Sequence, residues 1–393
     1  MSDLNPLDPA SLLMNAGMVD DWSQLLPGPG RSAFLEACTE ADSDDGRLRT
    51  VLGRYFSTWK TSLMADDLSR LQMLATCVQV REYVKVICVE DDFDEFEETS
   101  LSESSIIWPR HEDGQVAVET LGEELLKSML AAKQLLPDRL EIRDKRTSRA
   151  PSDPETAALL ARNILDGADL AITAFSVRKE SPMTTIIAAE LSAEHQSQGT
   201  GFSILRKAEL CLNHNLNSYW ANQILFHAPA LKELSLSFFQ PHNIPRITPF
   251  VLSDMSLPKL EKLELSMAIL PVKSIMAILS QSEQSLTDIS FRLITLVNNS
   301  PWAELLNRIS NEFPHLARFK LTHLSEGPIG QSQVTFPGLD KVSVVGEPYR
   351  NGLKLLQKGP AGNKRIPGVE YRGPDANHVL RIVAKVAVTT EYK

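Results

Sequence analysis

The amino-acid sequence predicts an α/β fold in which parallel strands carry helices on their outer side. An apolar pattern, L-x-x-L-x-L, returns six times at spacings of 23–30 residues, starting at Leu205, Leu231, Leu260, Leu286, Leu316 and Leu339. Between these segments, apolar residues recur three and four positions apart, which indicates helices, at residues 220–226, 272–279 and 302–309. Each unit is therefore predicted to run strand, loop, helix and turn.

The spacing of the pattern lies around the ~20–29 residues that are typical of leucine-rich repeats. A single repeat of this kind cannot bury its own apolar face, so neighbouring repeats stack into a solenoid. We therefore expect an irregular leucine-rich-repeat-like solenoid over residues 201–393. Residues 376–388 are expected to end it as a capping helix or strand.

Two further segments are predicted before the solenoid. Residues 1–46 contain scattered prolines and glycines, and we expect them to be disordered or loosely ordered. Residues 47–200 are expected to form a helical, irregular early-repeat region. Its predicted elements are helices at 47–56 and 66–75, a buried strand at 83–89, and a helix–strand unit at 155–177.

Composition and charge limit the function classes. The net charge of −10 argues against a nucleic-acid partner. Residues 1–120 hold 23 acidic and 9 basic side chains, whereas the remainder holds 27 and 31. The four cysteines form no C-x-x-C pair, so neither a zinc site nor a disulfide framework is predicted. We expect no signal peptide and no membrane span, and a cytoplasmic or nuclear location.

Motifs that would indicate catalysis are poorly matched. Gly28 to Ala33 fits G-x-G-x-x-A, but no strand precedes it, and Pro29 removes an N–H that would face phosphate. The acidic run at residues 90–98 lacks the residue order of a calcium loop. We therefore expect a protein that is not an enzyme, with no catalytic residue, no cofactor and no metal site.

The repeat geometry suggests where a partner would bind. Alternate strand residues face opposite sides, so inward-pointing leucines place the residues between them on the open concave face. This face is predicted to become basic from Arg292 onward and to bind an acidic segment of another protein. A plain solvated face is the alternative. The candidate partner-binding residues are Glu233, Lys262, Glu264, Asp288, Arg292, Arg318, Lys320 and Lys341.

Two stretches of the chain resemble a known family. Between residues 68 and 92, Leu71-x-x-Leu74 leads through residues 80–86 into the acidic run. The repeat array at residues 205–345 is the second stretch. In both, the chain is similar to fungal F-box/leucine-rich-repeat-like proteins. The resemblance implies an N-terminal F-box of three short helices that docks the adaptor of a cullin-type ubiquitin ligase, with repeats that receive the substrate.

The expected F-box motif is degenerate or missing here. It would open with Leu-Pro and continue with dense Leu and Ile within residues 1–50. Residues 1–46 offer only residues 12–14, Trp22 and residues 25–27. The resemblance implies a substrate-recognition subunit of a ubiquitin ligase, contacting the adaptor only if an F-box is present. One alternative is a repeat scaffold with no ubiquitin link, and a second is an enzyme with an unrecognised site.

Overall fold

The computed structural model describes most of the chain, and its elements fall into two compact units. Unit 1 contains helices α2 to α6 and strands β1 to β3, and unit 2 contains strands β4 to β16 with helices α10 to α14. The described residues are 16–26, 28–41, 45–61, 65–90, 127, 130–132, 134–144, 164–179, 201–213, 225, 227–239, 258–297, 301–327, 332–358 and 365–391.

Unit 1 begins with three helices, α2 (Ala16–Leu25), α3 (Gly28–Ala41) and α4 (Asp45–Phe56). The ring of Phe34 on α3 packs edge-on against Tyr55 and Phe56 of α4, at centroid distances of 5.4 and 5.5 Å. The expectation of loose order for residues 1–46 therefore does not hold for residues 16–26 and 28–41. Gly28, Pro29 and Gly30 form the start of α3, where Pro is tolerated, and buried apolar residues pack the helices together.

The rest of unit 1 is a small parallel sheet with two further helices. Its strands are β1 (Thr58–Thr61), β2 (Val86–Glu90) and β3 (Arg139–Asp144), with β1 parallel to β2 and β2 parallel to β3. Helices α5 (Ala65–Thr76) and α6 (Val78–Arg81) connect β1 to β2. The predicted helices at 47–56 and 66–75 are thus confirmed, and the strand predicted at 83–89 is found as β2, which starts later, at Val86. The acidic residues 91–98 lie outside the described residues.

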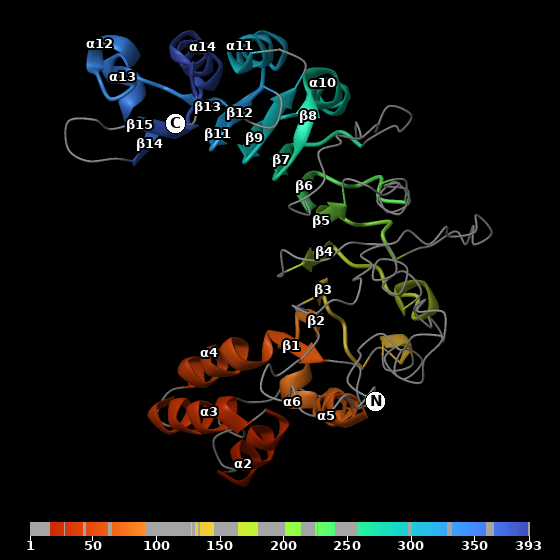
Figure 1. The fold of residues 1–393 in the computed structure, drawn as a ribbon. Coiled ribbons are helices and arrows are strands. Elements are labelled where there is room, and N and C mark those ends of the chain that lie inside the picture. Colours follow the sequence, from red (N-terminus) through yellow and green to blue (C-terminus); the bar gives the residue numbers. More distant parts are fainter. Residues whose placement is uncertain are drawn as a thin grey trace, which may run out of the picture. The chain divides into compact units, whose positions relative to one another are not determined.

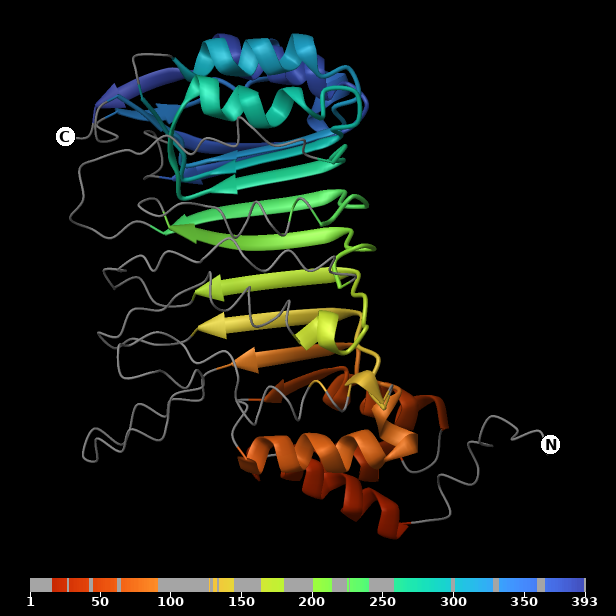
Figure 2. The same cartoon turned by 90° about the vertical axis from the view of Figure 1, so that its right-hand side faces the viewer.

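Unit 2 is built around a large, mostly parallel sheet. Strands β4 (Ala174–Lys179), β5 (Lys207–Asn213), β6 (Glu233–Phe239), β7 (Lys262–Ser266), β9 (Asp288–Arg292) and β11 (Arg318–Thr322) are neighbours in this order. All of these neighbouring pairs are parallel. Figures 1 and 2 show them side by side with a common direction. The predicted sequential order of the strands near Leu231, Leu260 and Leu286 is confirmed.

The register of this sheet places equivalent apolar residues of successive strands side by side. Leu234 pairs with Leu263, Leu263 with Ile289, and Ile289 with Phe319. Each of these side chains is 1% exposed. Helices α10 (Val272–Ser280), α11 (Trp302–Glu312) and α14 (Ala376–Val386) cover one side of this part of the sheet (Figure 1), and the burial of the four side chains indicates that they face this side. The predicted inward direction of the leucine positions is therefore correct.

The helices of unit 2 have apolar faces and abrupt starts. The N-cap positions of α10 and α11 are Pro271 and Pro301, which hold extended backbone just before each helix. Both predicted helices, at 272–279 and 302–309, are confirmed, whereas the one predicted at 220–226 lies almost wholly outside the described residues. The predicted C-terminal cap is α14, followed by strand β16 (Val388–Glu391), and Asn377 donates from Nδ2 to the carbonyl of Phe313 at 2.9 Å.

A corner residue follows three successive strands of the large sheet. Met267, Leu293 and His323 have positive φ values of 55°, 54° and 52°, the left-handed conformation that bulky residues rarely adopt. After each corner the chain enters a second sheet, through β8 (Ile269–Pro271), β10 (Thr295–Val297) or β12 (Ser325–Glu326). Strands β13 (Ser332–Thr335) and β16 complete this second sheet in antiparallel pairing.

The prediction of a sixth repeat strand starting at Leu339 is wrong. Lys341 lies in a turn after Gly338, and residues 342–345 form the short helix α12 (Val342–Val345). Leu339 is buried within the turn and Val345 is buried at the end of α12, so neither lies on a strand. Gly338, with φ of 81°, starts the turn, and its carbonyl accepts a hydrogen bond from the backbone N–H of Lys341.

An antiparallel hairpin occupies the place of that strand. Its strands are β14 (Leu353–Lys358) and β15 (Arg365–Arg372), and β15 pairs antiparallel with β11. Helix α13 (Glu347–Arg350) precedes it. Gly352 is needed where the hairpin begins, because an added Cβ would lie 2.3 Å from the carbonyl oxygen of Arg372.

Candidate interaction surface

One side of the large sheet in unit 2 is lined by polar side chains, and we call it the polar face. It lies opposite the helix-covered side, because its residues alternate along each strand with the buried apolar ones. On β6, β7, β9 and β11 these residues are Glu233, Ser235, Ser237, Lys262, Glu264, Ser266, Asp288, Ser290, Arg292, Arg318, Lys320 and Thr322. Seven of the eight predicted partner-binding residues therefore share this face.

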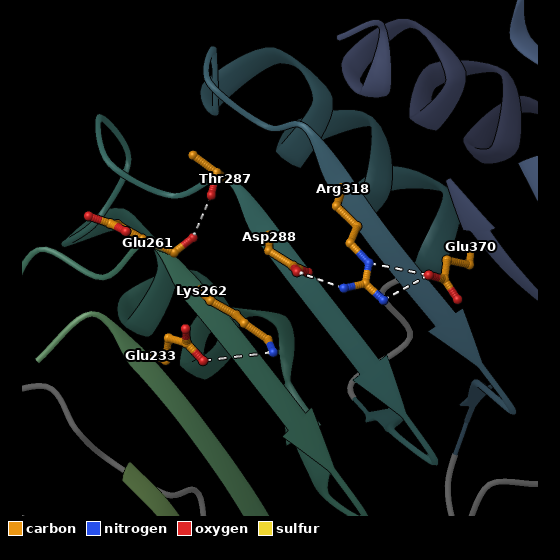
Figure 3. Close-up of polar contacts among 7 residues, drawn as sticks. All are labelled: Glu233, Glu261, Lys262, Thr287, Asp288, Arg318 and Glu370. Carbon is orange, nitrogen blue, oxygen red and sulfur yellow. Dashed lines mark hydrogen bonds and ion pairs between the residues drawn. The ribbon is translucent and has the colours of Figure 1, made fainter. Parts of the chain in front are cut away.

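The early strands of the polar face are close to electrically balanced. On β5, Lys207 Nζ lies 2.8 Å from Glu209 Oε1. Lys262 on β7 lies 4.0 Å from Glu233 Oε2 on β6, at the limit of an ion pair (Figure 3). Such partly exposed pairs contribute only about 0–1 kcal/mol each. These strands present alternating charge rather than a patch of one sign.

Arg318 is held between two carboxylates in the centre of the later strands. Its Nη2 and Nε donate to Glu370 Oε1 at 2.8 and 3.2 Å, and its Nη1 donates to Asp288 Oδ2 at 3.3 Å (Figure 3). The hydrogen bonds to Glu370 are the main cause that raises the pKa of Arg318. This guanidinium therefore cross-links β9, β11 and β15 and is already occupied within the chain.

Asp288 is a carboxylate of this cluster that is disfavoured by burial. Burial raises the pKa of its carboxyl above the usual 3.8 and outweighs the neighbouring positive charges of Arg318 and Lys262. Glu264 on the next strand adds to the increase by repulsion. The positive charges of Arg318 and Lys262 therefore compensate only part of the hydration that the ionised Asp288 carboxylate loses on burial.

Other cations of the polar face have no such partner among the residues that the structure describes. Arg292, Lys320 and Arg372 are exposed, and none of them forms an ion pair with another described residue. Arg372 lies opposite Arg318, and Lys354 on β14 lies opposite Glu370. The strands β9, β11, β15 and β14 therefore carry a surplus of positive charge, although Arg318 does not supply it.

The structure revises the predicted residue set in two ways. Lys341 is exposed beside α12 and does not belong to the polar face. Glu370, Arg372 and Lys354 belong to it but were not predicted, because Pro367 and Gly368 interrupt the strand pattern of β15. The alternation of apolar Val369 and Tyr371 with charged Glu370 and Arg372 is the signal that would have indicated this strand.

The chemistry available on the polar face is that of charge and hydrogen-bond recognition. Within the described ranges, no group of three or more His, Cys, Asp or Glu side chains is placed to hold a metal ion. Helices long and apolar enough to cross a membrane are also absent from the described part of the chain.

Unit 2 thus belongs to the α/β class, with a large and mostly parallel sheet. A search of protein-family models finds no model that matches the chain. A search of curated protein sequences also finds no significant match. The class of fold and the residues of the polar face are therefore the basis for a functional proposal.

Proposed function

We propose that this chain is a non-catalytic protein-interaction module, and that the polar face of unit 2 binds its partner. The observation that carries the proposal is that Arg292, Lys320 and Arg372 are exposed on adjacent strands of one sheet face and form no ion pair with another described residue. An enzyme would need a deep pocket with convergent polar groups. Exposed cations spread over neighbouring strands instead suit recognition of a complementary surface.

We also propose that unit 2 is an irregular leucine-rich-repeat-like solenoid. The supporting features are the sequential parallel order of β5 to β11 and the recurrence of one stacked apolar position per unit. The corner residues Met267 and Leu293 add a backbone feature that recurs with the same spacing. Repeated units that contact mainly their neighbours are typical of such architectures.

The leading biological role is substrate recognition within a cullin-type ubiquitin ligase, acting inside the cytoplasm or nucleus. The family resemblance suggests this role, and the order of α2, α3 and α4 in unit 1 supports it, because an F-box consists of three short helices. Such a subunit binds an adaptor through its helices and a second protein through its repeats. A repeat scaffold with no ubiquitin link would bind only the second protein.

The test is co-purification of the full chain with a cullin-ligase adaptor and with its other bound proteins. Lys320→Glu is the informative variant, because Lys320 is exposed and makes no ion pair with a described residue. Arg318→Glu is unsuitable, since it would place three carboxylates together. Lys341→Glu is the matched control, with the same charge change at an exposed site outside the polar face.

We expect the adaptor to co-purify with the wild type and with both variants, and the second protein to be lost only from Lys320→Glu. If Lys320→Glu loses the second protein but no adaptor co-purifies with any form of the chain, the result would favour the repeat scaffold with no ubiquitin link. The proposal of an interaction module through this face would be wrong if Lys320→Glu and Lys341→Glu retained the same proteins as the wild type.

A further inference from the structure

Two corner residues expose large apolar side chains at a costly backbone conformation. Met267 and Leu293 have φ near +55° and are 44% and 43% exposed. Glycine or asparagine is the usual residue at such a φ, because a bulky side chain clashes with the backbone there. Side chains that remain this exposed contribute little to the core. Burial in the core therefore does not require Met and Leu at these two positions, which we call the corner ridge.

The unpaired cations next to the corner ridge form a straight diagonal across three strands. Lys320 on β11 lies opposite Ser290, two residues before Arg292 on β9. Lys320 also lies opposite Glu370, two residues before Arg372 on β15. Each step along Arg292, Lys320 and Arg372 thus moves one strand across and one residue pair along the sheet. Diagonal neighbours of this kind are about 7–8 Å apart.

The corner ridge and this cation diagonal are continuous. Arg292 directly precedes Leu293, and its carbonyl accepts a hydrogen bond of 2.9 Å from the backbone N–H of Met267. Two exposed apolar residues therefore adjoin the end of the diagonal at Arg292. A ligand that matches it needs an apolar group at one end and negative charges spaced at the diagonal interval.

We propose that the corner ridge and the cation diagonal bind an extended acidic segment of another protein that carries an apolar side chain at one end. This inference rests on the proposed function and names the chemistry of the partner. In an extended chain, every second side chain points the same way at about 6.6–6.8 Å. Carboxylates at alternate positions of the segment therefore match Arg292, Lys320 and Arg372.

A nucleic acid is a less suitable occupant. Glu264, Asp288 and Glu370 lie among the cations and would repel a continuous polyanion. The corner ridge would also meet only phosphate and sugar along a backbone-bound strand. A peptide can place its carboxylates at the cations, keep neutral side chains at the carboxylates, and bury an apolar side chain on Met267 and Leu293.

The test measures fluorescence anisotropy of labelled synthetic peptides titrated with the full chain. The first probe is Phe-Ser-Asp-Ser-Asp-Ser-Asp, made in both sequence directions, with blocked ends. The control probe has the same composition with its three Asp residues contiguous. An oligothymidylate of seven nucleotides is the third probe. We expect the alternating peptide, in one direction, to bind more tightly than the contiguous peptide and the oligonucleotide.

Variants of the chain assign the binding to this surface. Lys320→Glu should weaken binding of the alternating peptide about tenfold, because an attraction becomes a repulsion, while Lys341→Glu leaves it within about twofold. Leu293→Asn should also weaken it. Asn tolerates the left-handed conformation, so the thermal midpoint of Leu293→Asn should not fall, which separates lost binding from lost folding.

Equal binding of the alternating and contiguous peptides would overturn the inference, as would unchanged binding by both Lys320→Glu and Leu293→Asn. Tighter binding of the oligonucleotide through Lys320 would replace the acidic segment by a nucleic acid. If no peptide binds but Lys320→Glu still removes a co-purified protein, the proposed function stands and only the partner chemistry is wrong.

Discussion

At the scale of single residues, Asp288 differs from an ordinary surface carboxylate. Its side chain is only 17% exposed, and the loss of hydration raises its pKa despite the guanidinium of Arg318 at 3.3 Å. A carboxyl whose pKa is higher in the folded than in the unfolded state binds protons more readily when folded. Folding therefore becomes less favourable as pH rises from the unfolded pKa, near 3.8, through the raised folded pKa.

Asp288→Asn should remove this pH-dependent penalty. The free energy of unfolding of the variant, relative to wild type, should increase as pH rises from below 3.8 toward neutrality. The physical reason is that only the wild type must keep a partly buried carboxylate ionised at neutral pH. Urea unfolding at a series of pH values measures the difference. A relative stability of the variant that decreases with rising pH would show that the pairing with Arg318, rather than burial, dominates.

At the scale of structural elements, the strands of the large sheet place apolar side chains on one face and polar side chains on the other. Leu263 and Leu265 are buried on the helix-covered side, whereas Lys262 and Glu264 lie on the polar face of the same strand. The buried residues lie opposite their equivalents on both neighbouring strands, in register. The apolar side therefore provides the packing between neighbouring strands of the large sheet, and the polar face is available for other roles.

Leu263→Ala should lower the free energy of unfolding by about 2–5 kcal/mol, because it leaves a cavity between Leu234 and Ile289. Glu264→Ala on the opposite face of the same strand should cost under about 0.5 kcal/mol, as an ordinary surface change. Urea unfolding of the full chain compares the two. Similar costs for both substitutions would contradict the division of this strand into a buried and a polar side.

At the scale of the whole molecule, the local charge of the polar face opposes the charge of the chain. The chain carries a net charge of −10, yet the later strands of unit 2 present exposed cations that form no ion pair within the described part of the chain. A partner that binds them approaches a molecule that is acidic elsewhere. Its attraction therefore depends on short-range contact with Arg292, Lys320 and Arg372 rather than on the net field of the chain.

Binding of a natural partner should weaken as the salt concentration rises. The Debye length falls from about 10 Å at 0.1 M to about 3 Å at 1 M, so exposed charge pairs lose most of their attraction. The measurement is the amount of partner retained by immobilised wild-type chain during washes of increasing sodium chloride. A partner retained equally at all salt concentrations would be held by apolar contacts, and the cation diagonal would then have no part in holding it.

The sequence alone determined the parallel strands and which of their faces is buried. The reason is that the period of two along a strand and the spacing of 26–30 residues between Leu231, Leu260, Leu286 and Leu316 are local and repeated properties. They also placed Arg292 and Lys320 correctly on the polar face. Helices α4, α5, α10 and α11 followed from apolar spacing for the same reason.

Tertiary structure alone decided which strand lies beside β11 and which charges remain unpaired. Leu339 matches the repeated pattern, but a turn at Gly338 directs it into the core beside α12, and the hairpin of β14 and β15 takes the open edge. Glu370 reaches Arg318 from 52 residues away in the sequence. Spacing along the chain carries no information about such a contact, because antiparallel pairing across β11 is set by packing and hydrogen bonding between distant segments.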